Sequence, residues 1–117
     1  MKSNVRAAIA AIALSHATGR KVSSVFSYGG EGYISIDASV SGERVDGYDY
    51  TNGCYVDGNL PNLYHYGQGA HIDFKPKGNG QYDGYDYGSS CHFDVTVRGT
   101  NADVFDYGAG GYFSYST

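Results

Sequence analysis

Three histidines and three aspartates in the middle of the chain have the side chains needed to bind a metal ion. They are His65, His71, His92, Asp73, Asp86 and Asp94. Imidazole nitrogens and carboxylate oxygens suit zinc and similar ions. Their spacing follows no established metal-binding motif, and the repeat described below places tyrosine or aspartate where these histidines stand. We therefore predict neither a metal site nor a cofactor, and interpret the histidines as variants on a strand surface.

Ser89 and Ser90 stand between Asp86 and His92, an arrangement that could form a nucleophile with its base. A catalytic serine also needs a pocket and donors that stabilise an oxyanion. Both serines fall in an expected exposed turn, and the glycines of this chain punctuate hairpins instead of opening a helix around a phosphate. The sequence therefore predicts that the protein is not an enzyme.

A third set of side chains could bind a ligand by aromatic stacking and hydrogen bonding. The set comprises Tyr33, Tyr55, His71, His92, Tyr112, Asp57, Asp73, Asp86 and Asp94. Aromatic faces stack on sugar rings, and carboxylates accept hydrogen bonds from hydroxyl groups. Tyrosine is also a strong strand former and aspartate keeps a surface soluble, so an ordinary strand surface explains the same residues.

These residues belong to a unit that the chain repeats five times. Each unit is centred on a tyrosine that we call the anchor: Tyr28, Tyr50, Tyr66, Tyr87 and Tyr107. An aromatic residue stands two positions before each anchor, a small residue four positions after it, and an apolar residue six positions after it. The anchors are 22, 16, 21 and 20 residues apart. A period of about twenty residues indicates a repeat architecture.

Each unit is expected to fold as a β-hairpin. If the anchor faces the residue four positions later, a three-residue loop connects the strands, and such loops usually end in glycine. Gly53, Gly69 and Gly110 stand at that position. This register turns the anchors, and the aromatic residues two positions before them, into the core. It turns outward the polar residue before each anchor: Ser27, Asp49, His65, Asp86 and Asp106.

Residues 22–117 are expected to form ten short strands. The approximate spans are 22–28, 32–40, 44–50, 54–58, 61–66, 70–75, 81–87, 91–98, 102–107 and 111–116. Strands in strict sequence predict an all-β antiparallel up-and-down meander, whose apolar face must be buried and whose edges must be protected. A closed barrel or a two-sheet sandwich is favoured, and a hairpin solenoid is the remaining alternative.

Residues 1–21 lie outside the repeat. The stretch 5–17 contains six alanines and no glycine or proline, which favours a helix, and Gly19 suits the position just past its end. We expect this helix to cover the β-structure as a lid or plug. The basic start and short apolar run also resemble a secretory signal, with a cleavage site near Ala17. Localisation therefore stays open: cytoplasmic with a retained helix, secreted or periplasmic with a signal peptide.

Length and charge exclude several classes of function. The 117 residues suit one domain, 1–117. Residues 22–117 carry twelve acidic and four basic side chains, which argues against nucleic-acid binding. No apolar run approaches the roughly 20 residues of a membrane span.

Cys54 and Cys91 occupy equivalent positions in two different units, so we expect free, buried thiols and no disulfide.

The period and the aromatic hairpin resemble the choline- and glucan-binding repeats of bacterial surface proteins. Those repeats depend on tryptophan, which is absent here, so the resemblance covers the repeat form alone and transfers no site residues. The sequence thus predicts a non-enzymatic module that binds a carbohydrate or a protein partner through its outward tyrosine, histidine and aspartate side chains. A self-assembling structural module and a small-molecule carrier with an aromatic-lined cavity are the alternatives.

Overall fold

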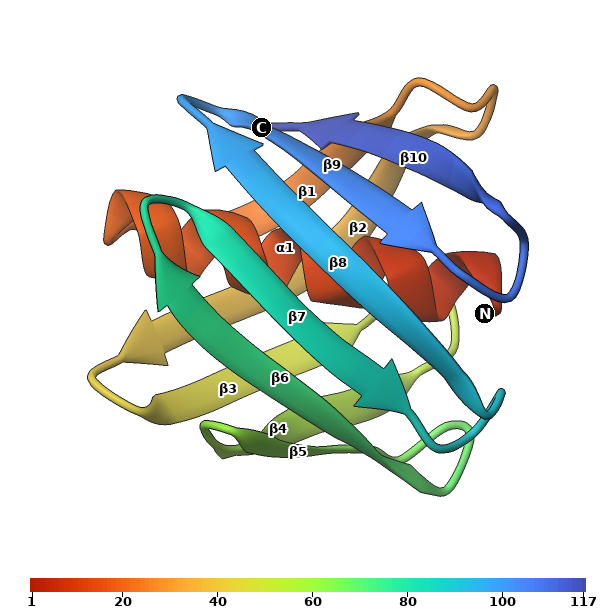
Figure 1. Cartoon of the computed structure of the whole chain (residues 1–117). Coiled ribbons are helices and arrows are strands. Elements are labelled where there is room, and N and C mark those ends of the chain that lie inside the picture. The colour runs from red at the N-terminus through yellow and green to blue at the C-terminus, as the bar shows by residue number, and fades with distance from the viewer.

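The computed structural model describes all 117 residues as a closed antiparallel β-barrel around a single helix (Figure 1). The elements are α1 (Ser3–Thr18), β1 (Val22–Ser27), β2 (Gly32–Ser41), β3 (Arg44–Asp49), β4 (Cys54–Asn59), β5 (Asn62–His65), β6 (Ala70–Gly78), β7 (Gln81–Asp86), β8 (Cys91–Arg98), β9 (Asn101–Asp106) and β10 (Gly111–Ser116). Each strand pairs with its sequence neighbours, and β1 pairs with β10. The predicted meander is confirmed, and of the three architectures the barrel is the one observed.

The helix α1 runs through the interior of the barrel, with strands in front of it and behind it in Figure 1. Every residue from Ala7 to Ser15 is at most 2% exposed. A helix that is apolar on all sides must be buried on all sides, and its alanines let the strands approach closely. Gly19 ends the helix in the left-handed conformation, as predicted. The helix is therefore a plug, and it also forms the centre of the core.

The rest of the core comes from inward-facing strand residues. Phe74, Phe93 and Ile72 are at most 1% exposed and belong to one cluster with α1. Cys54 and Cys91 are buried and free, as predicted. The helix α1 is not long and apolar enough to cross a membrane.

The strand register differs by one residue from the prediction. Asp86, instead of Tyr87, pairs with Cys91, and Tyr85 pairs with His92. The loop therefore has four residues and begins with the anchor. Its last residue is left-handed in four units: Gly53, Gly69, Ser90 and Gly110. The three glycines were thus placed correctly, whereas the start of the loop was not.

Hydrogen bonds explain why the strand ends before the anchor. The Asp106 Oδ1 atom accepts hydrogen bonds from the amides of Gly108 (2.8 Å) and Ala109 (3.2 Å). Short polar side chains commonly stabilise turns in this way. The same position accepts loop amides in the other units, through Ser27, Asp49, His65 and Asp86. The side chain must therefore lie inside the barrel, beneath its own loop.

This shift reverses the first strand of every hairpin, because side chains alternate between the two faces. The anchors, predicted to be core residues, are 53–62% exposed: Tyr28, Tyr50, Tyr66, Tyr87 and Tyr107. The polar residues predicted to face outward are at most 3% exposed: Ser27, Asp49, His65, Asp86 and Asp106. Phe26, Tyr48, Tyr64, Tyr85 and Phe105, also predicted to be core residues, lie partly exposed on the outer face. In the second strand of each hairpin, the side chains face as predicted, with the apolar residues inward and the tyrosine or histidine five positions after the anchor outward.

Candidate functional site

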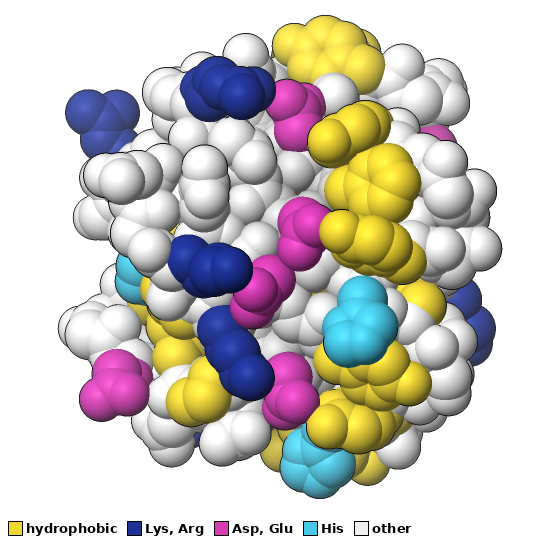
Figure 2. Space-filling view, in the orientation of Figure 1, with side chains coloured by type: hydrophobic (Ala, Val, Ile, Leu, Met, Phe, Trp, Pro, Cys, Tyr) yellow, Lys and Arg dark blue, Asp and Glu magenta, His cyan; other side chains and the backbone are white.

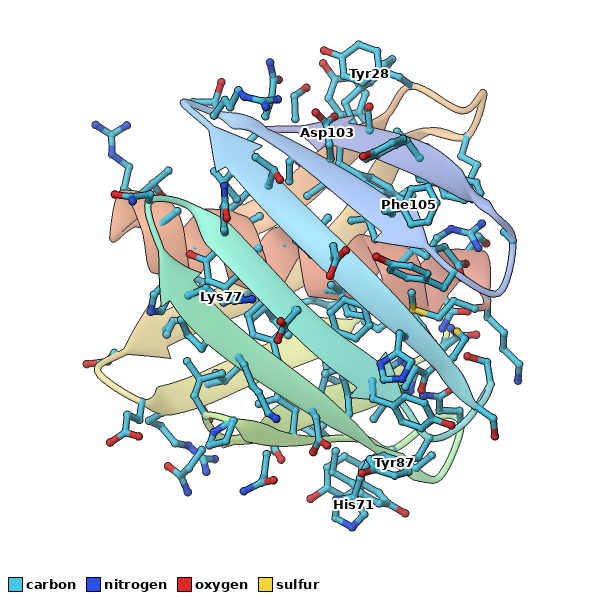
Figure 3. All side chains as sticks on the ribbon, in the orientation of Figure 1. Tyr28, His71, Lys77, Tyr87, Asp103 and Phe105 are labelled. Carbon is cyan, nitrogen blue, oxygen red and sulfur yellow. The ribbon has the colours of Figure 1, made fainter.

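Each hairpin carries three rings on the outer face beside its loop. They are the anchor, the aromatic residue two positions before it, and the tyrosine or histidine five positions after it. Neighbouring rings meet edge to face with centroids 4.7–5.1 Å apart. We call these five clusters the aromatic belt. Figure 3 shows Tyr28, Phe105, Tyr87 and His71 of the belt following one another across the outer face from the top to the bottom of the view.

Anchor hydroxyl groups join neighbouring hairpins. The Tyr87 hydroxyl donates a hydrogen bond to Asp73 (3.0 Å), and the Tyr107 hydroxyl donates one to Asp94 (2.6 Å). Each hydrogen bond to a carboxylate raises the pKa of its tyrosine. The Asp carboxylates are thus held in place by the next unit, with their remaining lone pairs facing solvent.

An open groove of about 760 Å³ lies between the ring clusters of units four and five. We call it the fourth-unit groove. Its side chains come from three consecutive hairpins and include three carboxylates, four rings and one lysine: Asp73, Asp83, Asp94, Tyr85, Tyr87, His92, Tyr107 and Lys75. Gly84 and Phe93 also line it. The groove therefore offers aromatic surface and hydrogen-bond acceptors side by side.

A smaller version of this groove, of about 270 Å³, lies over the second unit. We call it the second-unit groove. Six of its lining residues stand at positions that also line the fourth-unit groove: Asp37, Asp46, Gly47, Tyr48, Tyr55 and Asp57. Lys21 and Ser39 complete the lining. The two units share the sequence Asp-Gly-Tyr-Asp-Tyr, at 46–50 and 83–87. The repeated sequence thus builds a repeated site.

Charge along these grooves is mixed, with acidic groups in excess. Lys77 pairs with Asp83 (3.1 Å), and Arg44 pairs with Asp46 (2.9 Å). Figure 2 shows acidic side chains in a column next to a column of aromatic and histidine side chains. Such a surface favours neutral or basic ligands over anions.

The predicted ligand-binding residues divide into three groups. Asp73, His92 and Asp94 meet in the fourth-unit groove, and Tyr55 and Asp57 meet in the second-unit groove. Tyr33, His71 and Tyr112 face outward but line neither groove. Asp86 was placed on the wrong face, because it caps its loop from inside the barrel.

Sequence reasoning missed several groove residues. Tyr85 and Tyr107 were assigned to the core, and Asp83 and Lys75 were not singled out. The shared Asp-Gly-Tyr-Asp-Tyr sequence is the signal that would have found Asp83 and Tyr85, since it sets units two and four apart from the others. Lys75 and Tyr107 come from neighbouring units, and no pattern within one unit indicates them.

The serine, aspartate and histidine side chains considered for catalysis do not form one group. Asp86 is buried inside the barrel, whereas His92 is exposed on the outside. The Ser89 hydroxyl donates a hydrogen bond to Asp86 (2.6 Å), which is part of the loop cap. The histidines that were considered as metal ligands are also divided, because His65 faces the interior and His71 and His92 face solvent.

A polar ring lies at the loop end of the barrel, around the start of α1. It consists of the inward residue before each anchor: Ser27, Asp49, His65, Asp86 and Asp106. Asn4 donates to Asp49 (3.2 Å), and Arg6 donates to Asp106 (3.1 Å). Burial alone would raise the pKa of Asp106, but hydrogen bonds from the Met1 ammonium group, the Ala109 amide and Arg6 hold it below its ordinary value. The ring therefore ties the helix to the hairpins.

Burial shifts the pKa values of two other side chains at the loop end of the barrel, His65 and Cys54. Desolvation lowers the pKa of His65, although the nearby Asp49 carboxylate opposes the shift. Desolvation raises the pKa of the Cys54 thiol. Both side chains are thus neutral in the interior at neutral pH.

Known proteins offer no further guide to either the grooves or the polar ring. A comparison of the chain with protein-family models, with curated proteins and with solved structures returns no match.

Proposed function

We propose that the protein is a non-enzymatic binding module whose fourth-unit and second-unit grooves bind neutral or basic carbohydrates. The observation that carries this proposal is the recurrence of one site: three carboxylates beside tyrosine rings, built twice from the same five-residue sequence. Tyrosine rings stack on sugar faces, and carboxylates accept hydrogen bonds from sugar hydroxyl groups.

The rigidity of the groove supports the proposal. Asp73 and Asp94 are each fixed by an anchor hydroxyl, and Tyr85 is held edge to face between Tyr87 and His92, 4.8 Å from each. A ligand that meets preorganised side chains loses less binding free energy to ordering them. The groove thus provides fixed acceptors at fixed distances from an aromatic surface.

A glycan array followed by isothermal titration calorimetry tests the proposal. We expect binding of neutral or amino sugars, no binding of sialylated or sulfated glycans, and two binding sites on each chain. Asp94→Asn in the fourth-unit groove and Asp57→Asn in the second-unit groove should each remove one site. The Asp103→Asn variant is the matched control, because Asp103 lies on β9 outside both grooves and pairs with Arg98.

Two results would overturn the proposal. One is an array, supported by a thermal-shift panel, without a signal above background. The other is equal loss of binding in the Asp94→Asn and Asp103→Asn variants, since that would place the ligand away from the grooves.

The aromatic belt supports self-association as a second candidate function. Eight tyrosines are more than half exposed, a large amount of aromatic surface for a chain of 117 residues. Because every strand of the closed barrel pairs with a neighbour on each side, the belt is a better candidate for the associating surface than a sheet edge. Light scattering over a wide concentration range tests the belt: a constant monomer mass removes this candidate.

The carrier alternative has less structural support. The side chains of α1 occupy the interior where a carried molecule would lie. The helix would have to leave the barrel for this alternative to operate.

A further inference from the structure

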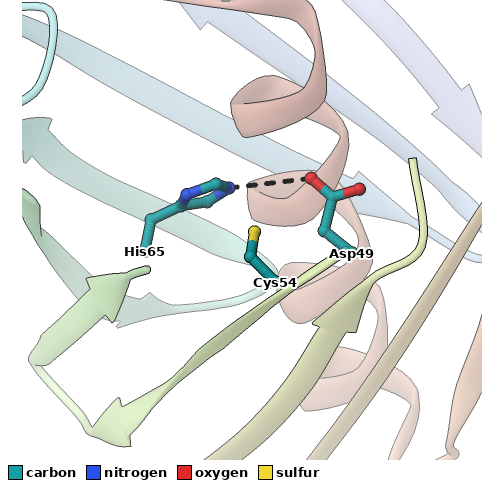
Figure 4. Close-up of side chains that lie close together, drawn as sticks. All are labelled: Asp49, Cys54 and His65. Atoms are coloured by element: carbon teal, nitrogen blue, oxygen red, sulfur yellow. Dashed lines mark ion pairs between the residues drawn. The ribbon is translucent and has the colours of Figure 1, made fainter. Parts of the chain in front are cut away.

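Asp49, Cys54 and His65 converge inside the barrel, at the loop end (Figure 4). One oxygen, one sulfur and one nitrogen atom of these side chains all lie within 4.8 Å of one another. Asp49 and His65 are fully buried, and Cys54 is 8% exposed. Carboxylate, thiolate and imidazole are the three side-chain ligands most often found on zinc.

The His65 ring has a polar atom without a partner. Its Nε2 atom is buried and makes no hydrogen bond. It points at Asp49 Oδ2 from 3.7 Å, which is too long for a hydrogen bond. Buried polar atoms are rarely left without a partner in folded proteins, and such an atom calls for an explanation. A cation held between His65 and Asp49 would supply the missing partner.

The equivalent place in the fourth unit already holds positive charge. There the cluster consists of Asp86, Cys91 and Asp106, and both Arg6 Nη1 and the Met1 ammonium group lie 3.1 Å from Asp106 Oδ2. Two cationic groups thus balance the buried carboxylates of that cluster.

The second-unit cluster lacks such a group. The hydrogen-bond donors to Asp49 are the side-chain amides of Asn4 and Asn52 and the backbone amides of Thr51 and Asn52, all neutral. A buried carboxylate is costly without a charged partner. The fourth-unit cluster thus balances two carboxylates with two cations, whereas the second-unit cluster keeps one carboxylate without a cation.

We propose that Asp49, Cys54 and His65 bind one divalent transition-metal ion, with zinc as the best match. Sulfur and nitrogen donors favour zinc over magnesium or calcium. With bonds of about 2.0–2.3 Å, ligand atoms on tetrahedral zinc lie about 3.3–3.5 Å apart, so the separations, which are at most 4.8 Å, have to shorten by up to about 1.5 Å. A carboxylate and a thiolate neutralise the double charge, and a neutral complex suits a buried site.

Proton transfers accompany binding. Cys54 loses its thiol proton to solvent as the sulfur–metal bond forms. The His65 Nδ1 atom accepts a hydrogen bond from the Gln68 amide (3.2 Å), which leaves the ring proton on Nε2. Binding through Nε2 moves that proton to Nδ1 and releases the Gln68 amide. The complete step releases one proton for each metal ion and keeps the imidazole neutral.

Cobalt(II) titration of the reduced, chelator-treated protein tests the site directly. We expect a thiolate-to-cobalt charge-transfer band in the near ultraviolet that saturates at one equivalent and disappears when zinc is added. One proton should be released for each metal ion, and the amide resonance of Gln68 should shift. A wild-type protein that shows no band at stoichiometric cobalt would overturn the proposal, whatever the variants do.

Variants assign the ligands. Cys54→Ala and His65→Gln should abolish the band, whereas Cys91→Ala, the equivalent cysteine in the other cluster, should keep it. Zinc should raise the melting temperature of the wild type and of Cys91→Ala, but not that of Cys54→Ala. Circular dichroism verifies that each variant is folded. A band that persists in Cys54→Ala, or that is lost in Cys91→Ala, would contradict the assignment.

Discussion

At the residue scale, the side chain before each anchor decides how its hairpin is built. Asp86 is fully buried and accepts hydrogen bonds from the Gly88 amide (3.0 Å), the Ser89 hydroxyl (2.6 Å) and the Gln68 side chain (2.7 Å). A carboxylate that satisfies several donors can be buried at acceptable cost. An aspartate that looks like a surface residue in the sequence therefore belongs to the interior.

Truncation of an anchor should cost little stability. Tyr87 is 53% exposed, so Tyr87→Ala should lower the free energy of unfolding by about 1 kcal/mol, mainly through the lost hydrogen bond and edge packing. Phe93 is fully buried on the partner strand, and Phe93→Ala should cost about 3–5 kcal/mol. Urea unfolding of both variants measures the difference. Equal losses would mean that the anchor faces the core.

Acid stability should depend on Arg6. The pKa of Asp106 is below its ordinary value of 3.8, so its ionisation stabilises the fold above about that pH, and this stability is lost as the pH falls through the folded pKa. Arg6→Met removes one cation from Asp106. It should raise the pKa of Asp106, shift acid unfolding to higher pH, and cost about 2 kcal/mol at neutral pH.

Carboxyl-carbon NMR titration measures that pKa, and circular dichroism follows the acid unfolding. Arg98→Met is the control, because the Arg98 pair with Asp103 is exposed and should contribute little. An unchanged acid-unfolding midpoint in Arg6→Met would contradict the role given to this buried pair.

At the scale of elements, glycine lets β7 lie against β6 where the fourth-unit groove forms. A Cβ atom on Gly84 would meet the Asp73 carbonyl oxygen and the Phe93 ring, and one on Gly47 would meet the carbonyl oxygens of Val56 and Asp37. The glycine of each Asp-Gly-Tyr-Asp-Tyr sequence is therefore required by close approach between strands. The same strands carry the groove carboxylates.

Gly84→Ala should thus lower the free energy of unfolding by about 2–3 kcal/mol, through steric overlap with the neighbouring strand. Gly111→Ala is the matched control, because a Cβ atom there would have no neighbour within 4 Å. Its effect should stay within about 0.5 kcal/mol. Chemical unfolding of the two variants decides the matter, and similar losses would show that strand separation adapts to the extra methyl group.

At the scale of the whole molecule, the barrel and the helix depend on each other. The strands enclose α1, and α1 fills the space that a ten-stranded barrel would otherwise leave at its centre. The interior has room for alanine side chains over much of the helix. A larger side chain should therefore lower the free energy of unfolding at a buried helix position and have little effect at an exposed one.

Ala11→Leu should cost about 1–3 kcal/mol, because Ala11 is fully buried and the added atoms overpack the interior. Ala17→Leu should change the free energy of unfolding by less than about 0.5 kcal/mol, since Ala17 lies exposed near the end of the helix. Thermal and urea unfolding measure both effects. A tolerated leucine at Ala11 would indicate that the helix is packed loosely inside the barrel.

The sequence alone determined the local pattern of this protein. Five copies of one aromatic unit, each followed by alternating apolar residues, predicted ten strands to within a few residues of those observed. Glycine at the end of the loops and the alanine-rich start of the chain predicted the turns and the helix. These features depend on conformational preferences and on contacts between neighbours in the chain, which the sequence displays directly.

Tertiary structure decided what depends on contacts between units. Three-residue and four-residue loops fit the same spacing, and the choice rests on whether Asp86 can find its donors inside a closed barrel. Closure, and the burial of α1 on all sides, follow from how ten strands fill space together. The fourth-unit groove joins three hairpins, and the Asp49, Cys54 and His65 cluster joins two. Such sites exist only once the strands are side by side.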